Sequence, residues 1–242
     1  MKKYFYGFLS VLTLFIIWYL FSLRIDNSYI LPSPITVIKT FINLLQSVST
    51  YLTILLTLFR LLIALIGSFI IGVILGVISG NYQGFSYFLR PIVSSLRSLP
   101  VASIIIIIII LIGSDSSLYI ITFLMVFPII YEATLSGVRN ISQDLQDSIS
   151  LEPKHKLIVM TKLQIPLAFP YILTSIFQSL GLGFKVIVMA EFIAQSSKGI
   201  GFELFRGSIS INYELVFAWT FIIIILVILM EFFIKKMKKL LT

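Results

Sequence analysis

Charged side chains gather in one polar stretch of this apolar chain, at about residues 139–166. Its centre reads Asp144-Leu-Gln-Asp-Ser-Ile-Ser-Leu-Glu-Pro-Lys-His-Lys156. Leu145 and Ile149 are four residues apart, so they would share one face of a short helix whose other side is acidic. Pro153 would end this helix and can begin a second one. The pattern fits a helix that docks to a soluble partner, and it fits an ordinary solvated connector as well.

The other ionisable residues do not form a catalytic arrangement. We interpret Asp115, Glu132 and Glu191 as isolated carboxylates and not as a paired acid–base site. The chain has no cysteine and one histidine, which excludes disulfides, thiol catalysis and a histidine metal cluster. It also lacks a G-x-x-x-x-G-K-S/T loop, which argues against a P-loop ATPase. We therefore expect no enzymatic activity and no cofactor in this chain.

The composition is that of an integral membrane protein. Of the 242 residues, 59% are hydrophobic and 12% are charged, and the mean hydropathy is +1.09. Soluble domains carry roughly 25% charged residues. Seven consecutive isoleucines at 104–110 would suggest a strand in a soluble protein. A lone strand in a bilayer leaves its backbone unsatisfied, so we predict an all-α membrane protein.

The apolar runs predict about six transmembrane helices. We place them at residues 4–23, 52–80, 101–112, 118–132, 166–194 and 213–234. The first run is long enough to span and lacks a cleavage site, so we interpret it as a retained span. The third is short, and we expect its helix to begin before Pro100. A helix with Ile35, Ile38, Phe41, Ile42 and Leu45 on one face should lie at the outer interface.

Charge asymmetry predicts the orientation. Net charge is +8, and the basic residues lie mainly at the ends of apolar runs. With both termini in the cytoplasm, twelve of the 18 Lys and Arg residues fall inside and four fall outside. The remaining two, Arg60 and Lys185, lie within spans. We expect Arg60 to sit near a span end or to face protein, because an arginine at mid-membrane is costly. Gly72, Gly76 and Gly80 recur on one side of the second span, which indicates close helix packing.

The polar stretch resembles the cytoplasmic loop of ABC-transporter permeases, whose pattern is E-A-A, three residues, G, nine residues, I-x-L-P. Counting back from Ile165-Pro166 puts Leu163 at the family's isoleucine and Pro153 at its glycine. Asp147-Ser148-Ile149 then falls at E-A-A. The spacing is intact although the letters differ. Proline at the glycine position cannot take positive φ, so the turn must be built differently.

Further stretches resemble one branch of these permeases, which imports sulfonates, taurine, nitrate and thiamine-precursor-like compounds. They follow the family order over nearly the whole chain. They are Leu31-Pro-Ser-Pro-Ile-Thr-Val37, Leu96-Arg-Ser-Leu-Pro-Val-Ala102, Phe127-Pro-Ile129, Thr134-Leu-Ser-Gly-Val-Arg139, Ile165-Pro-Leu-Ala-Phe-Pro-Tyr-Ile172, Val188-Met-Ala-Glu-Phe-Ile193 and Gly199-Ile-Gly201.

The resemblance implies a type I ABC importer permease of a bacterial-type plasma (inner) membrane, importing a small polar or anionic organic compound. Two copies would form the pathway, because the chain shows one coupling loop and no internal repeat. Two cytoplasmic ATPase subunits, which would hold the ATP and Mg, would dock on the loops, and an extracytoplasmic binding protein would deliver substrate. The coupling residues would be Asp144, Leu145, Asp147, Ser148, Ile149, Leu151, Glu152 and Pro153.

Two further expectations concern organisation and the pathway. Residues 1–48 would form a first span plus the outer amphipathic helix, and residues 49–242 the core permease domain. Gln178, Lys185 and Glu191 are the candidates for the pathway lining. Lys185 would favour anionic substrates there, or it would pair with a charge on another span. The alternative function is an ion-gradient-driven secondary transporter or channel, which would need a relay of intramembrane acids.

Overall fold

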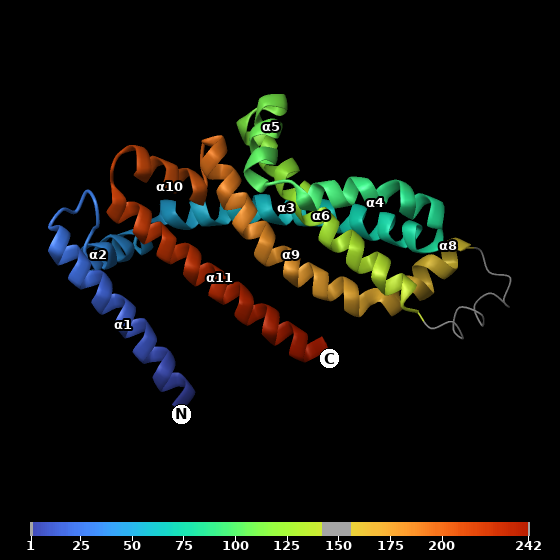
Figure 1. The fold of residues 1–242 in the computed structure, drawn as a ribbon, viewed down its shortest axis with the longest axis horizontal. Helices are drawn as coiled ribbons and strands as arrows, with labels where there is room; N and C mark the ends of the chain where they lie inside the picture. Colours follow the sequence, from blue (N-terminus) through green and yellow to red (C-terminus); the bar gives the residue numbers. More distant parts are fainter. Residues whose placement is uncertain (1, 142–155, 242) are drawn as a thin grey trace.

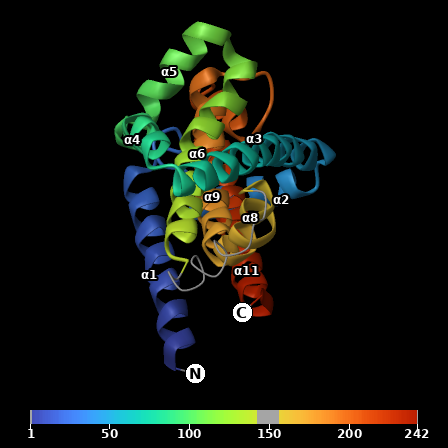
Figure 2. The same cartoon turned by 90° about the vertical axis from the view of Figure 1, so that its right-hand side faces the viewer.

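The computed structural model describes residues 2–141 and 156–241, all of whose regular elements are helices (Figure 1). In chain order they are α1 Lys2–Ile25, α2 Pro34–Leu45, α3 Val48–Asn81, α4 Gln83–Ser98, α5 Val101–Ile112, α6 Ser114–Arg139, α8 Lys156–Val159, a π-helical turn Met160–Gln164, α9 Ile165–Ala194, α10 Ile200–Ile209 and α11 Tyr213–Leu241. The first turn of α1 and the last turn of α11 lie on the same side of the molecule in both views (Figure 1, Figure 2).

Helices α3, α6 and α9 form the centre of the molecule and carry most of its buried side chains. Ile121, Val126 and Ile130 of α6 are almost fully buried, as are Ile172 and Ile187 of α9. Both helices pack closely on each other, and α3 packs along α6. The outward faces of the bundle expose large apolar side chains, as expected for surfaces that contact lipid.

The glycines of α3 allow α3 and α6 to approach closely. A Cβ added at Gly72 would lie 3.0 Å from Ile130, one at Gly76 would lie 2.6 Å from Thr134, and one at Gly80 would lie 2.5 Å from Val138. The partners are spaced four residues apart on α6, just as the glycines are on α3. The predicted packing role of these glycines is therefore confirmed.

We expect Gly76→Ala to destabilise the chain by about 1–3 kcal/mol, the usual cost of overpacking. The added methyl group would also lie 2.9 Å from the Tyr131 carbonyl oxygen, which is backbone and cannot rotate away. Gly67→Ala in the same helix is the matched control, since its Cβ would meet only Phe123 at 3.7 Å. Thermal unfolding in detergent measures both variants. Equal melting temperatures would show that α3 and α6 can separate without cost.

The structure corrects the predicted start of the helix that contains the isoleucine run, because α4 and α5 are two separate helices. The helix of the isoleucine run does not begin before Pro100. Residues 83–98 form a separate helix, and α5 begins at Val101 after a bend of 104°. Leu99 is extended, with φ −71° and ψ 136°, because a residue before proline disfavours the helical region. Pro100 in turn has no N–H to continue α4. As a result α5 projects from the bundle (Figure 1, Figure 2).

Five helices are long and apolar enough to cross a membrane, and a sixth span results if α4 and α5 count as one bent span. This agrees with the predicted six. Helix α2 lies against α11 through a face that includes Pro34 and Val37. Its other apolar residues, Ile35, Ile38 and Ile42, point outward, so α2 is apolar on two sides. The predicted face combined these outward residues with Phe41, whose ring packs against Phe221 of α11.

Candidate functional site

A cavity of about 800 Å³ lies where α6, α9 and the end of α4 meet. Its wall is unusually polar for a surface of membrane-spanning helices. The lining residues are Arg97, Ile129, Glu132, Ala133, Ser136, Pro170, Tyr171, Thr174, Ser175 and Gln178. Tyr171, Thr174 and Gln178 are spaced by three and four residues, so they form one exposed face of α9.

An ion pair stands in the wall of this cavity. Arg97 in the last turn of α4 donates to the carboxylate of Glu132, near the middle of α6. Both side chains are partly exposed, at 56% for Arg97 and 41% for Glu132. The break after α4 fixes the position of Arg97, because it ends the helix within one residue of this arginine.

A second polar cavity of about 450 Å³ lies between α4 and α6 and adjoins the first. The two cavities share Glu132 and Ser136, and the second adds Arg90 and Arg139. The Arg139 guanidinium donates to the hydroxyl of buried Ser86 at 2.8 Å, which fixes its orientation. The charged residues that line the two cavities are thus three arginines and one glutamate.

The structure separates the three predicted pathway residues. Gln178 lines the larger cavity. Lys185 lies seven residues further, on the same face of α9, but it lines a different, apolar pocket of about 280 Å³ with Phe184, Met189 and Leu204. No ion pair joins Lys185 to any residue that the structure describes.

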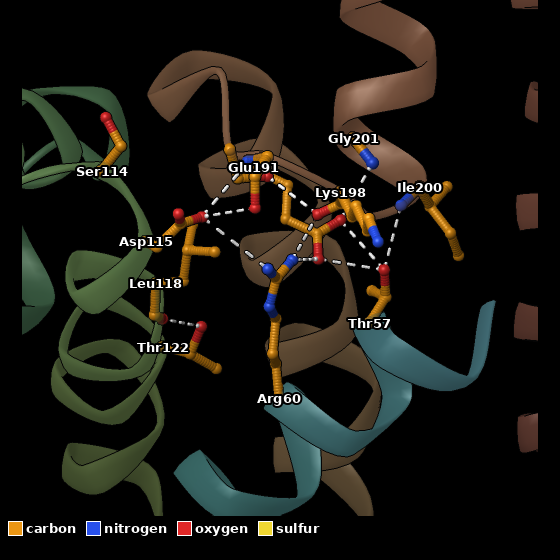
Figure 3. A network of polar contacts seen from close by, with 12 residues as sticks. Thr57, Arg60, Ser114, Asp115, Leu118, Thr122, Glu191, Lys198, Ile200 and Gly201 are labelled. Atoms are coloured by element: carbon orange, nitrogen blue, oxygen red, sulfur yellow. Dashed lines mark hydrogen bonds and ion pairs between the residues drawn. The ribbon is translucent and has the colours of Figure 1, made fainter. Parts of the chain in front are cut away.

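Glu191 lies apart from both cavities and is fully buried (Figure 3). Arg60 donates to its carboxylate at 2.8 Å, and the Thr57 hydroxyl is 3.0 Å from both carboxylate oxygens. The backbone N–H of Gly201, in the first turn of α10, donates to it at 3.0 Å. This network joins α3, α9 and α10, so protein encloses Glu191 in the single chain.

Arg60 also contacts Lys198, just before α10, and Asp115, in the first turn of α6 (Figure 3). It donates to the backbone oxygen of Lys198, and Asp115 at the start of α6 lies 3.8 Å from it. The Ser197 N–H donates to the Asp115 carboxylate at 3.3 Å. The prediction that Arg60 faces protein is confirmed, because its side chain is buried.

These contacts correct the interpretation of the carboxylates as isolated. Glu132 pairs with Arg97, Glu191 pairs with Arg60, and Asp115 shares Arg60. The Arg60 and Glu191 positions are 131 residues apart, and no local pattern indicates such a pair. No group of three or more His, Cys, Asp or Glu side chains among the described residues could hold a metal ion.

Sequence reasoning missed most of the larger cavity. Arg97 and Glu132 appeared only as a charge for topology and as an isolated acid. One signal was available: Tyr171, Thr174 and Gln178 place a polar stripe on a span that is otherwise apolar. The predicted coupling residues 144–153 lie outside the residues that the structure describes.

Five helices long and apolar enough to cross a membrane, with a cavity lined by polar residues beside them, are the features of a multi-pass membrane protein among the described residues. Residues 72–241, more than half of the chain, match the family described as binding-protein-dependent transport system inner membrane component. The chain belongs to this family, which is the ABC importer permease family that the motifs predicted. It is accordingly a multi-pass inner membrane protein.

Three relatives illustrate the range of the similarity. The chain is 26% identical over 238 residues to a putative aliphatic sulfonates transport permease protein of Bacillus subtilis, covering 96% of this chain and 85% of the relative. It is 27% identical over 116 residues to a putative molybdenum transport system permease protein of the same species, covering 46% and 51%. It is 31% identical over 90 residues to the bicarbonate transport system permease protein of Synechococcus elongatus, covering 37% and 32%. The last two matches thus span about half and a third of those relatives.

Proposed function

We propose that this chain is the membrane-spanning permease subunit of an ATP-driven ABC importer, in which two copies enclose the substrate pathway. One observation carries the proposal: the polar cavity of α6 and α9 lies on the exposed face of the single chain. An ion pair and a row of polar side chains facing lipid would be costly. A second copy related by two-fold symmetry would place the same surface opposite and enclose a polar path.

The substrate of this proposed pathway is a small anionic or strongly polar compound. Among the described residues, three arginines and one glutamate line the two adjoining cavities, so an anion would find an excess of positive charge there. The names of three relatives refer to aliphatic sulfonates, molybdenum and bicarbonate transport. Lys185 is a less direct candidate for substrate contact, because apolar side chains surround it.

Energy would enter from partner chains. In the proposed mechanism, ATP closes a pair of ATPase subunits docked on residues 144–153, and the spans follow between inward- and outward-facing states. Each ligand can shift this equilibrium only by its differential affinity for the two states. ATP and Mg would be bound on the ATPase subunits, and an extracytoplasmic binding protein would deliver the substrate.

An ion-gradient-driven transporter, the alternative, requires an acid that can exchange ions within the membrane. Glu191 is held in a buried network with Arg60, so this acid does not favour the alternative. Co-purification tests the proposal. The tagged chain should retain an ATPase subunit, and vesicles holding the complex should accumulate substrate only with ATP. Uptake that persists without ATP and follows an ion gradient would support the alternative.

Labelling of single cysteines tests the proposed orientation in an otherwise cysteine-free chain. Cysteines introduced at Ser47 and Ser197 should react with an impermeant thiol reagent in whole cells, because the basic residues place both positions outside. A cysteine at Ser150, on the predicted coupling loop, should react only after the cells are opened. Labelling of position 150 in intact cells would reverse the proposed topology.

A further inference from the structure

We infer that Arg97 and Glu132 are an exchangeable counter-ion pair through which the larger cavity selects anions, an inference that rests on the proposed pathway. Glu132 would neutralise Arg97 while the cavity is empty, and an arriving anion would take its place. Arg97 is thus assigned as a specificity-determining residue, and Glu132 as the carboxylate that competes with the arriving anion for Arg97.

The exposure of the pair supports exchange. Both partners are partly exposed in the cavity wall, and such ion pairs are weakly held because water competes for both charges. The Arg60–Glu191 pair is the contrasting case in the same chain. There both partners are buried, and Thr57 and Gly201 donate additional hydrogen bonds to the carboxylate. A solute entering the cavity can therefore displace Glu132 but cannot displace Glu191.

The hydrogen-bond donors of the cavity also favour an anion. The Thr174 and Ser175 hydroxyls donate to the carbonyl oxygens of Pro170 and Ile172 on their own helix, so their protons are already used. The Tyr171 hydroxyl accepts from Asn140 at 3.3 Å, and it donates its own proton to no residue that the structure describes. The Tyr171 hydroxyl, the Gln178 amide and the Arg97 guanidinium then present donors to one space.

The charge balance continues beyond this pair. Among the described residues that line the two cavities, Glu132 is the one acid, while Arg90 and Arg139 line the second cavity. An anion that exchanges with Glu132 at Arg97 therefore meets further guanidinium groups along the same wall, and not a second carboxylate. The pair itself is neutral, so the preference for an anion comes from Arg90 and Arg139 beside it.

Collisional quenching tests the inference without knowledge of the substrate. A single cysteine at Gln178, labelled with an uncharged bimane, reports from the cavity of the full-length chain, which has no cysteine of its own. Iodide is the anionic probe, acrylamide is the neutral probe, and low-chloride buffer of constant ionic strength avoids competition. In the Arg97→Gln variant, iodide quenching should fall about threefold, since a unit charge at contact distance is worth about that factor even near water. In Glu132→Gln, iodide quenching should rise by a similar factor.

Quenching by neutral acrylamide distinguishes an effect of charge on quenching from a change in the shape of the cavity. Its quenching should stay constant in both variants, and Arg97→Lys should retain iodide quenching because the charge remains. The matched control is the pair Arg206→Gln and Glu203→Gln, which removes a different Arg–Glu pair on α10. Iodide quenching that is unchanged in Arg97→Gln and Glu132→Gln would overturn the inference. Iodide and acrylamide quenching that change together would also overturn it, because the pair would then only shape the cavity.

Transport measurements distinguish this inference from the proposed function. In an active importer, Glu132→Gln should lower both KM and kcat for an anionic substrate, because the anion binds more tightly and leaves more slowly. The expected quenching in a chain that binds no ATPase would uphold the pair and contradict the proposed function. ATP-driven uptake with unaltered iodide quenching would contradict the pair alone.

Discussion

Replacing Arg60 by methionine should lower the free energy of unfolding by about 3–5 kcal/mol, the usual cost of removing one partner of a buried ion pair. Glu191 would keep its bonds from Thr57 and Gly201 but would lose the guanidinium at 2.8 Å. Its charge would then stay buried without a counter-ion. For a chain of this size the apparent melting temperature in detergent should fall by about 6–20 °C.

Two variants control this result. Arg206→Met removes the 56% exposed arginine of a pair on α10 and should lower the melting temperature less than Arg60→Met, whose arginine is buried. The double variant Arg60→Met with Glu191→Met removes both charges and should be more stable than Arg60→Met alone. A melting temperature of Arg60→Met that equals that of Arg206→Met would show that the Arg60–Glu191 pair contributes nothing to folding.

Exchange of Leu145 and Ile149 for aspartate should abolish ATPase binding while the chain still inserts into the membrane. Both residues lie on the proposed coupling loop, outside the described part of the structure, so the argument comes from sequence. At a spacing of four they share a helical face, and each could contribute about 1.5–3 kcal/mol when buried against a partner. Co-purification with the ATPase and ATP-driven uptake measure the loss.

Ser150→Asp adds the same charge to a polar position of this segment and should keep the ATPase. Pro153→Gly should also be tolerated, because glycine can adopt the φ of proline as well as positive values. Normal ATPase binding by the double aspartate variant would show that the loop only connects two spans. The importer proposal would then lose its coupling mechanism.

Features that depend on local spacing could be predicted from the sequence. The glycines of α3 recur every fourth residue, and the structure places all three in close contact with side chains of α6. The apolar runs likewise predicted the spans, because a bilayer demands about 20 apolar residues per helix. The orientation of Arg60 toward protein followed from the cost of exposing its charge to lipid.

Features that depend on tertiary contacts could not be predicted. Nothing near Glu191 in the sequence indicates that Arg60 lies beside it, and Glu132 meets Arg97 only because α4 folds back along α6. Helix α4 itself was missed, since its polar residues and Pro91 resemble a loop. Its buried face, with Ser86, Leu89 and Val93, becomes apparent only when α3 and α6 are in place.

The 104° bend between α4 and α5 has a consequence for hydration. A helix that ends at Ser98 and another that begins at Val101 leave carbonyl and amide groups without intrahelical partners at both ends. Hydrocarbon cannot satisfy such groups, so a span interrupted in this way must border protein or water. The cavity beside Arg97 provides the space for that water. The same proline that shortens the span therefore places these unpartnered backbone groups next to the ion pair, so that water in the cavity could reach both.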